Sequence, residues 1–191
     1  MTDDEKWRIG IAAVAEEFAA LEQARQDAVV ALVRQIMAIK GEIAACFSLV
    51  DGAAVCAKCG GECCRAGRYH FTVIDLLAYL VHQRQLFTPS FDSGACPFIG
   101  AAGCLMAPQF RPYNCVTFVC DRVELGMAPD LRQSFSSLCD RLLACYLEME
   151  ELLANRFRSG LLINCERYLD RKAAMLGAVD RFLPPRGLGE K

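Results

Sequence analysis

Apolar residues recur at every third or fourth position through much of the first fifty residues. The repeat is clearest at Val29, Leu32, Ile36, Ile39, Ile43, Cys46 and Val50. This spacing places the side chains on one face of a helix, close to the heptad seam of a helical bundle. Upstream the repeat continues to Phe18, but Glu22 and Arg25 interrupt it. The pattern predicts one long helix over residues 1–50 that is bent or exposed near Glu22.

The same spacing returns in the last third of the chain. Its apolar positions are Phe135, Leu138, Leu142, Cys145, Met149 and Leu152. They predict a second long helix, from Pro129, which suits a first helical turn, to about Arg158. A shorter helix is expected from Asn164, and the polar Pro/Gly tail 177–191 is expected to fray. Core packing within the chain is the simplest interpretation of both stripes, and a homodimer through the amphipathic helices is the alternative.

Residues 51–128, between the two stripes, are richer in Gly, Pro and Cys. One helix is expected there, over 72–85, because Thr72 with Asp75 three residues later resembles a capping box. The rest is predicted to be loops and turns. The fold class is therefore mainly α: a long-helix bundle with an inserted cysteine-rich, loop-dominated metal-binding module. As a single domain, 1–191 divides into 1–50, 51–128, 129–176 and the tail 177–191.

Composition limits the classes of protein that remain. Hydrophobic residues make up 54% and charged residues 23%, which argues against disorder. A net charge of -2 and a pI near 5.7 argue against a nucleic-acid partner. The acidic start "MTDDEKWR" does not resemble a signal peptide, and no apolar run reaches the ~20 residues of a membrane span. A cytoplasmic protein without a membrane partner is expected.

Twelve cysteines stand out in such a chain, because a reducing compartment keeps thiols from forming disulfides. Eight of them gather in the middle segment, beside Gly or Pro: Cys56, Cys59, Cys63, Cys64, Cys96, Cys104, Cys115 and Cys120. Loops allow sulfur atoms to converge, and Cys-x-x-Cys is a common two-ligand arm. These eight are the candidate metal ligands, for zinc or an iron–sulfur cluster. Nearby cations that could offset thiolate charge are Lys58, Arg65, Arg68 and Arg111.

The order of these motifs resembles the YkgJ-type cysteine-cluster family, which is described as zinc- or iron-chelating. The matching residues are Cys56, Cys59, Gly60, Cys63, Cys64, Arg65, Asp75, Cys96, Pro97, Phe98, Gly103, Cys104, Arg111, Pro112, Cys115, Phe118 and Cys120. The resemblance covers about residues 55–121. Two departures are one extra residue between Cys59 and Cys63, and "NCVTF" in place of Cys-Arg-x-Phe. The resemblance implies metal binding, and the similar flagellin lysine methylases, associated with an iron–sulfur cluster, make that cofactor credible.

Two functions remain open at this point. The first is a metal-binding protein whose centre serves structure, metal handling or docking of a protein partner. The alternative, resting on resemblance, is an iron–sulfur enzyme with redox or protein-modifying, methylase-like activity, for which no catalytic residue is assigned. His70 is a further possible ligand, although a lone histidine near such a cluster more often has a supporting role. Outside the segment, Cys46, Cys139, Cys145 and Cys165 are expected to pack as small apolar side chains.

Overall fold

The computed structural model describes residues 1–59, 62–92, 94, 96–100 and 103–177, without the side chains of 57, 59, 62, 63, 65 and 66. Over these residues the chain is mainly helical, as predicted. Its α-helices are α1 (Asp3–Ala20), α2 (Gln23–Leu49), α3 (Gly52–Cys59), α4 (Val73–Val81), α5 (Tyr113–Thr117), α6 (Asp121–Glu124), α7 (Pro129–Leu152) and α8 (Leu161–Leu169). Two 3₁₀ helices, η1 (Glu62–Tyr69) and η2 (Pro108–Phe110), and an antiparallel ribbon of β1 (Ile99–Gly100) and β2 (Gly103–Cys104) complete the described elements.

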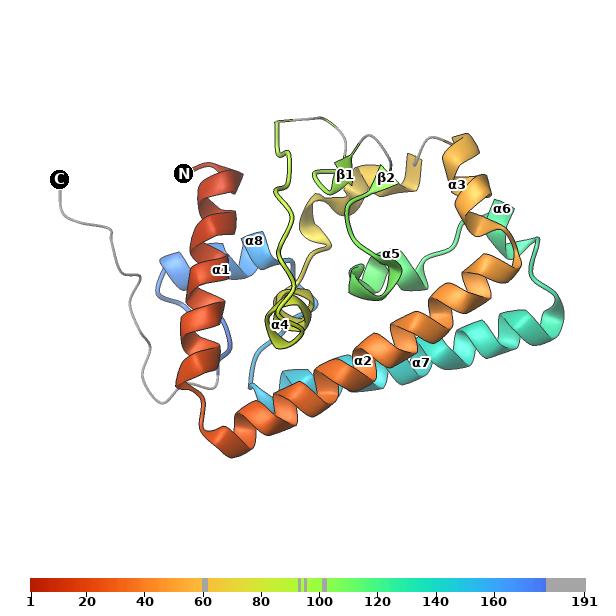
Figure 1. Cartoon of the computed structure of the whole chain (residues 1–191). Coiled ribbons are helices and arrows are strands. Elements are labelled where there is room, and N and C mark those ends of the chain that lie inside the picture. The colour runs from red at the N-terminus through yellow and green to blue at the C-terminus, as the bar shows by residue number, and fades with distance from the viewer. Residues whose placement is uncertain (60–61, 93, 95, 101–102, 178–191) are drawn as a thin grey trace.

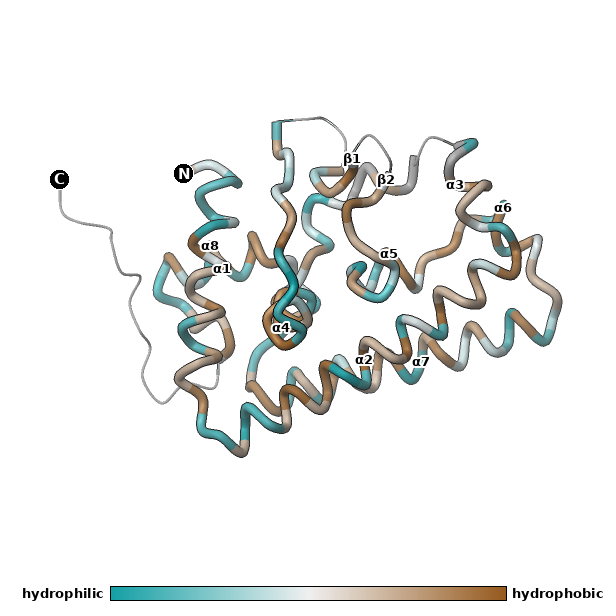
Figure 2. Tube along the Cα trace, viewed as in Figure 1, coloured by the Kyte–Doolittle hydropathy of each residue, from teal (hydrophilic) through white to brown (hydrophobic). Residues whose placement is uncertain are grey.

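The two long helices α2 and α7 lie side by side and form the base of the molecule (Figure 1). Apolar and polar residues alternate along both of them (Figure 2). The predicted stripe of α2 is buried from Val29 to Cys46, and that of α7 is buried from Phe135 to Met149. Both stripes therefore belong to the core of one chain, which confirms the simpler of the two interpretations.

The predicted N-terminal helix is wrong in one respect, because it is two helices. It breaks at Leu21 and Glu22, whose backbones are extended, and α1 packs against α8 while α2 packs against α7. The amide of Gln26 donates hydrogen bonds to the carbonyls of Phe18, Ala19 and Leu21 at 3.0, 3.3 and 3.1 Å. These bonds satisfy carbonyls that the end of α1 leaves without helical partners. The interruption of the stripe marked this break.

The other predicted helix ends are partly right. Thr72 and Asp75 form the expected capping box of α4, although that helix ends at Val81. The second long helix ends at Leu152, six residues before the predicted end, and α8 begins after Gly160. Asn164 is not a cap, because its amide donates back to the carbonyl of Ser159 at 2.8 Å from inside α8. The predicted tail, apart from Gly177, lies outside the described residues.

The cysteine-rich segment departs from the loop-dominated prediction. Cys56 and Cys59 lie in α3, Cys63 and Cys64 lie in η1, and Cys115 lies in α5. Helix α3 forms because "GAAVCAKC" is mostly alanine and other residues that tolerate a helix. Within the described ranges, no helix has both the length and the apolar character needed to cross a membrane.

Candidate metal centre

Three cysteines from other elements lie within electrostatic range of Cys115. Cys64 comes from η1, Cys96 from the turn before β1, Cys104 from β2 and Cys115 from α5. Burial raises the pKa of the Cys115 thiol, and the negative charges of Asp75, Cys104, Cys96 and Cys64 raise it further. We call these four residues the Cys115 group.

A glycine makes room for one member of this group. A Cβ atom placed on Gly67 would lie 2.5 Å from Sγ of Cys96, closer than real side chains approach. Cys96 is held in place because its carbonyl accepts from the N–H of Ile99 at 3.2 Å, and Ile99 pairs with Cys104 across the ribbon. The ribbon thus fixes two cysteines relative to each other, and Gly67 lets η1 close over one of them.

His70 lies directly beside Cys115. Its Nδ1 is 3.4 Å from Sγ of Cys115, and its backbone N–H donates to the carbonyl of Gly67 at 3.0 Å. Burial lowers the pKa of His70, and the charge of Asp75 partly opposes this effect. A lower pKa favours the neutral imidazole, which is the form that can bind a metal.

A buried polar network lies beneath the Cys115 group. One oxygen of Asp75 accepts from Nζ of Lys40 at 2.8 Å and from the hydroxyl of Tyr146 at 3.1 Å. The other oxygen accepts from the backbone N–H and hydroxyl of Thr72 at 2.9 and 2.8 Å. Lys40 is 1% exposed, and Asp75 and Tyr146 are fully buried. Burial, followed by the charge of Asp75, raises the pKa of Tyr146 well above its ordinary value.

This network joins the bundle to the cysteines. Lys40 belongs to α2, Asp75 to α4 and Tyr146 to α7. The ring of Tyr113 in α5 packs on that of Tyr146, with centroids 5.2 Å apart, two residues before Cys115. These contacts hold α5, which carries Cys115, against the bundle.

The sequence prediction missed Lys40 and Tyr146, and it treated Asp75 only as a helix-start residue. A signal for Lys40 was present. It lies four residues after Ile36 and three before Ile43, so a cation interrupts the apolar face of a predicted core helix. A lysine in that place is buried at a cost unless it is paired, which predicts a buried carboxylate nearby. Nothing comparable pointed to Tyr146.

The cations expected to offset thiolate charge are largely occupied elsewhere. Arg68 pairs with Asp3 of α1 at 3.2 Å and also donates to the carbonyl of Phe91. Arg111 donates to the carbonyl of Met106 at 3.4 Å. Lys58 is exposed, and the side chain of Arg65 lies outside the described residues. Two of the four predicted counter-charges thus serve to hold the segment in shape.

The remaining predicted ligands are placed less completely. Cys56 and Cys120 lie in α3 and immediately before α6, and these two helices are in contact (Figure 1). The side chains of Cys59 and Cys63 lie outside the described residues. Among the side chains that are described, no three His, Cys, Asp or Glu residues stand in an arrangement that could hold a metal ion. The Cys115 group therefore does not form a complete metal site in the described arrangement.

The cysteines outside this segment behave as predicted. Cys46, Cys145 and Cys165 are buried among apolar neighbours, and Cys139 is half-buried against the core. Burial raises the pKa of Cys139 and of Cys165 to about 11 each. Cys139 and Cys165 are therefore protonated at neutral pH and less reactive than an ordinary thiol.

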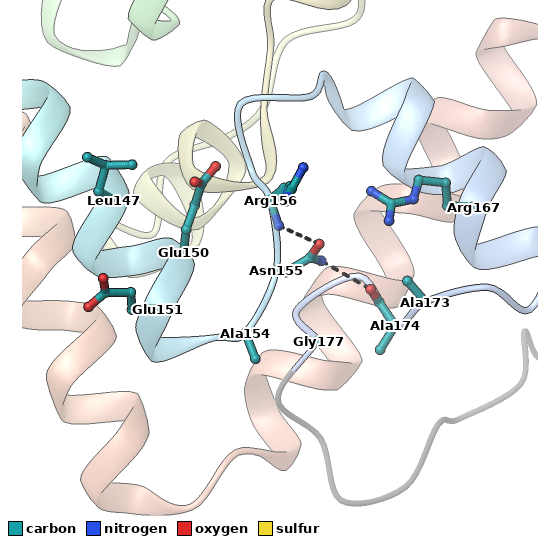
Figure 3. A pocket seen from close by; sticks show the side chains of 10 residues that line it. All are labelled: Leu147, Glu150, Glu151, Ala154, Asn155, Arg156, Arg167, Ala173, Ala174 and Gly177. Atoms are coloured by element: carbon teal, nitrogen blue, oxygen red, sulfur yellow. Dashed lines mark hydrogen bonds between the residues drawn. The ribbon is translucent and has the colours of Figure 1, made fainter.

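A cavity of about 640 Å³ lies at the end of α7, and none of the described residues that line it is a cysteine (Figure 3). It is lined by residues at the end of α7, by residues 154–156, by Arg167 of α8 and by the segment up to Gly177, and its charged lining residues are Glu150, Glu151, Arg156 and Arg167. Neither Arg68 nor Arg111 is among the residues that line it.

Comparisons with known proteins add no identification. No family model, no curated protein and no solved structure matches this chain. The donor chemistry of the site itself is the basis for a function. Thiol sulfurs and an imidazole are the ligands that zinc and iron–sulfur clusters prefer, and one such pair, His70 and Cys115, is in contact.

Proposed function

We propose that the protein binds zinc or an iron–sulfur cluster through clustered cysteine thiolates. The observation that carries the proposal is the contact between Nδ1 of His70 and Sγ of Cys115 at 3.4 Å, with Cys64, Cys96 and Cys104 close enough to act on Cys115. Without a cation, these thiols oppose one another's ionisation. A bound metal would reverse that effect, because it deprotonates coordinating thiols outright. Such a group has no evident purpose as four protonated thiols.

Cys64, Cys96, Cys104 and Cys115 are the proposed ligands of one centre. The described arrangement is open, so ligation would require these side chains to close on the metal. Cys56, Cys59, Cys63 and Cys120 remain candidates for the same centre or for a second one. When bound, zinc would supply a structural link between the elements, and an iron–sulfur cluster would add electron transfer.

Metal content and absorption of protein purified without air test the proposal. A brown protein absorbing near ~400 nm with about four iron atoms per chain indicates one cubane cluster, whereas a colourless protein with zinc indicates closed sulfur sites. Cys115→Ser is expected to reduce metal content sharply, and Cys139→Ser, a half-buried cysteine of α7, is the matched control. A wild-type chain that retains neither metal would overturn the proposal.

A second candidate function is an iron–sulfur enzyme with redox or protein-modifying activity. The observation in its favour is that Cys64 and Cys104 are exposed, whereas Cys96 is buried. A centre built on these ligands would keep one side open to solvent, which a purely structural site does not need. Reversible reduction of an iron-loaded protein would support this candidate, and a redox-inert zinc protein would exclude it.

A further inference from the structure

His70 is positioned to bind the same metal as Cys115. A sulfur at about 2.3 Å and an imidazole nitrogen at about 2.0–2.1 Å from one tetrahedral zinc lie about 3.6 Å apart. The observed separation of Nδ1 and Sγ is 3.4 Å. A hydrogen bond between a thiol and an imidazole spans a similar distance, so the experiment must separate the two interpretations.

The backbone holds both groups in place independently of any metal. The N–H of His70 donates to Gly67, and the carbonyl of the next residue, Phe71, accepts from Leu161 at 2.6 Å. The N–H of Cys115 donates to the carbonyl of Pro112 at 2.9 Å. Because His70 lies two residues before the cap of α4, its imidazole is presented from a fixed turn.

The charge around the site favours one neutral ligand. Four thiolates around zinc carry a net charge of about -2, and replacing one by imidazole reduces this to about -1. The nearest buried cation, Lys40, is already paired with Asp75, whose charge acts on Cys115. Arg68 and Arg111 are engaged with other partners. Burying a centre of smaller charge costs less free energy, and Lys40, Arg68 and Arg111 already interact with other groups.

We propose that His70 is a ligand, through Nδ1, of a mixed imidazole–thiolate centre that includes Cys115. This inference rests on the proposed function. No third ligand stands in place beside this pair among the described side chains, so the remaining ligands, drawn from Cys64, Cys96 and Cys104, would have to close on the metal. If the centre is an iron–sulfur cluster, an imidazole in place of a thiolate raises its reduction potential relative to an all-cysteine cluster.

X-ray absorption of the full chain saturated with Zn²⁺ and freed of excess metal tests this directly. The chain contains two histidines, so an imidazole shell at about 2.0–2.1 Å can come only from His70 or His82. His82 is exposed and lies at the end of α4. His82→Ala is expected to keep the imidazole shell. His70→Ala is expected to lose it, and its zinc affinity is expected to fall by about tenfold or more.

A rescue variant separates ligation from a supporting hydrogen bond. His70→Cys is expected to restore zinc binding with a sulfur-only shell, because a thiolate can replace an imidazole as ligand. A wild-type protein that binds zinc with sulfur alone would overturn the role of His70 and leave the proposed function standing. A wild-type protein that binds no zinc and no iron would overturn both. Wild type and His82→Ala decide the question even if His70→Ala fails to fold.

Discussion

The α2–α7 base and the cysteine-bearing segment are stabilised in different ways. Along the base, long apolar stripes face each other, and Leu142, Tyr146 and Met149 are fully buried. Burial of this kind contributes about 25 cal/mol for each Å² of apolar surface, and it needs no ligand. The base is therefore expected to fold and persist by itself.

The cysteine-bearing segment, residues 51–128, has shorter elements and more exposed apolar surface than the base. Its described helices are short, the longest being the nine-residue α4, and its strands have two residues each. Leu105 is 44% exposed and Phe118 is 60% exposed, so part of its apolar surface remains in water. Trp7 of α1 packs against Phe71 and Phe98 of the segment, which also contact each other, and this aromatic cluster attaches the segment to the bundle. If the cysteines bind a metal as proposed, this segment is expected to respond to its removal more than the base does.

Removal of metal is the largest expected effect and would test this contrast directly. Structural zinc sites contribute about 10–16 kcal/mol in small peptides, so chelation should release the segment. Hydrogen exchange is expected to accelerate strongly over residues 62–70, 96–105 and 111–118 and to change little in α2 and α7. Equal acceleration across all helices would show that the base is not independent. Unchanged exchange everywhere would show that the segment holds itself.

Loss of Lys40 is the next largest effect, because it acts where the two regions meet. Lys40→Met leaves the carboxylate of Asp75 buried without its cation, which typically costs about 3–5 kcal/mol. Urea unfolding measures the change. Lys172→Met, which breaks the exposed pair with Asp170, is the control and is expected to change stability by less than about 1 kcal/mol. A Lys40 variant as stable as the control would mean that the network does not join the regions.

Gly67→Ala is expected to have a smaller and more local effect. The new methyl group would collide with Sγ of Cys96, and overpacking of this type costs about 1–3 kcal/mol. Metal affinity should fall, while exchange in α2 and α7 stays as in wild type. Gly41→Ala is the matched control, because a Cβ there meets nothing within 4 Å. Equal metal affinity in both variants would remove Gly67 from the site.

The base was predictable from sequence because burial leaves a periodic trace. The steps from Val29 to Cys46 were sufficient to identify the buried face of α2, and Thr72 with Asp75 identified the start of α4. The break between α1 and α2 was only partly predictable, since it depends on Gln26 reaching back to carbonyls of the preceding helix. Such a contact leaves no periodic signal.

The candidate site was predictable in composition and not in geometry. Spacing identified the cysteines but not which of them meet, because Cys64, Cys96 and Cys115 are brought together by packing over residues far apart in the sequence. Asp75 was recognised by its local role, while its bonds to Lys40 and Tyr146 cross 35 and 71 residues. Long-range polar partners of this kind are set by the fold and are invisible to local patterns.

Glu17 offers the smallest expected effect and a contrast with Asp75. It is 1% exposed and accepts from the N–H groups of Met175 and Leu176 at 3.1 and 2.7 Å, but no cation pairs with it among the described contacts. Burial raises its pKa above the ordinary 4.5, despite these bonds. The folded state therefore holds this proton more tightly than the unfolded state, so the charged form of Glu17 lowers stability above its folded pKa. As pH falls through that pKa towards 4.5, the penalty disappears.

The stability of Glu17→Gln relative to wild type should accordingly be greatest near neutral pH and decline on acidification, as followed by urea unfolding at several pH values. A relative stability that rises on acidification would mean that the two N–H groups outweigh burial, and that this unpaired carboxylate stabilises the chain as Asp75 does.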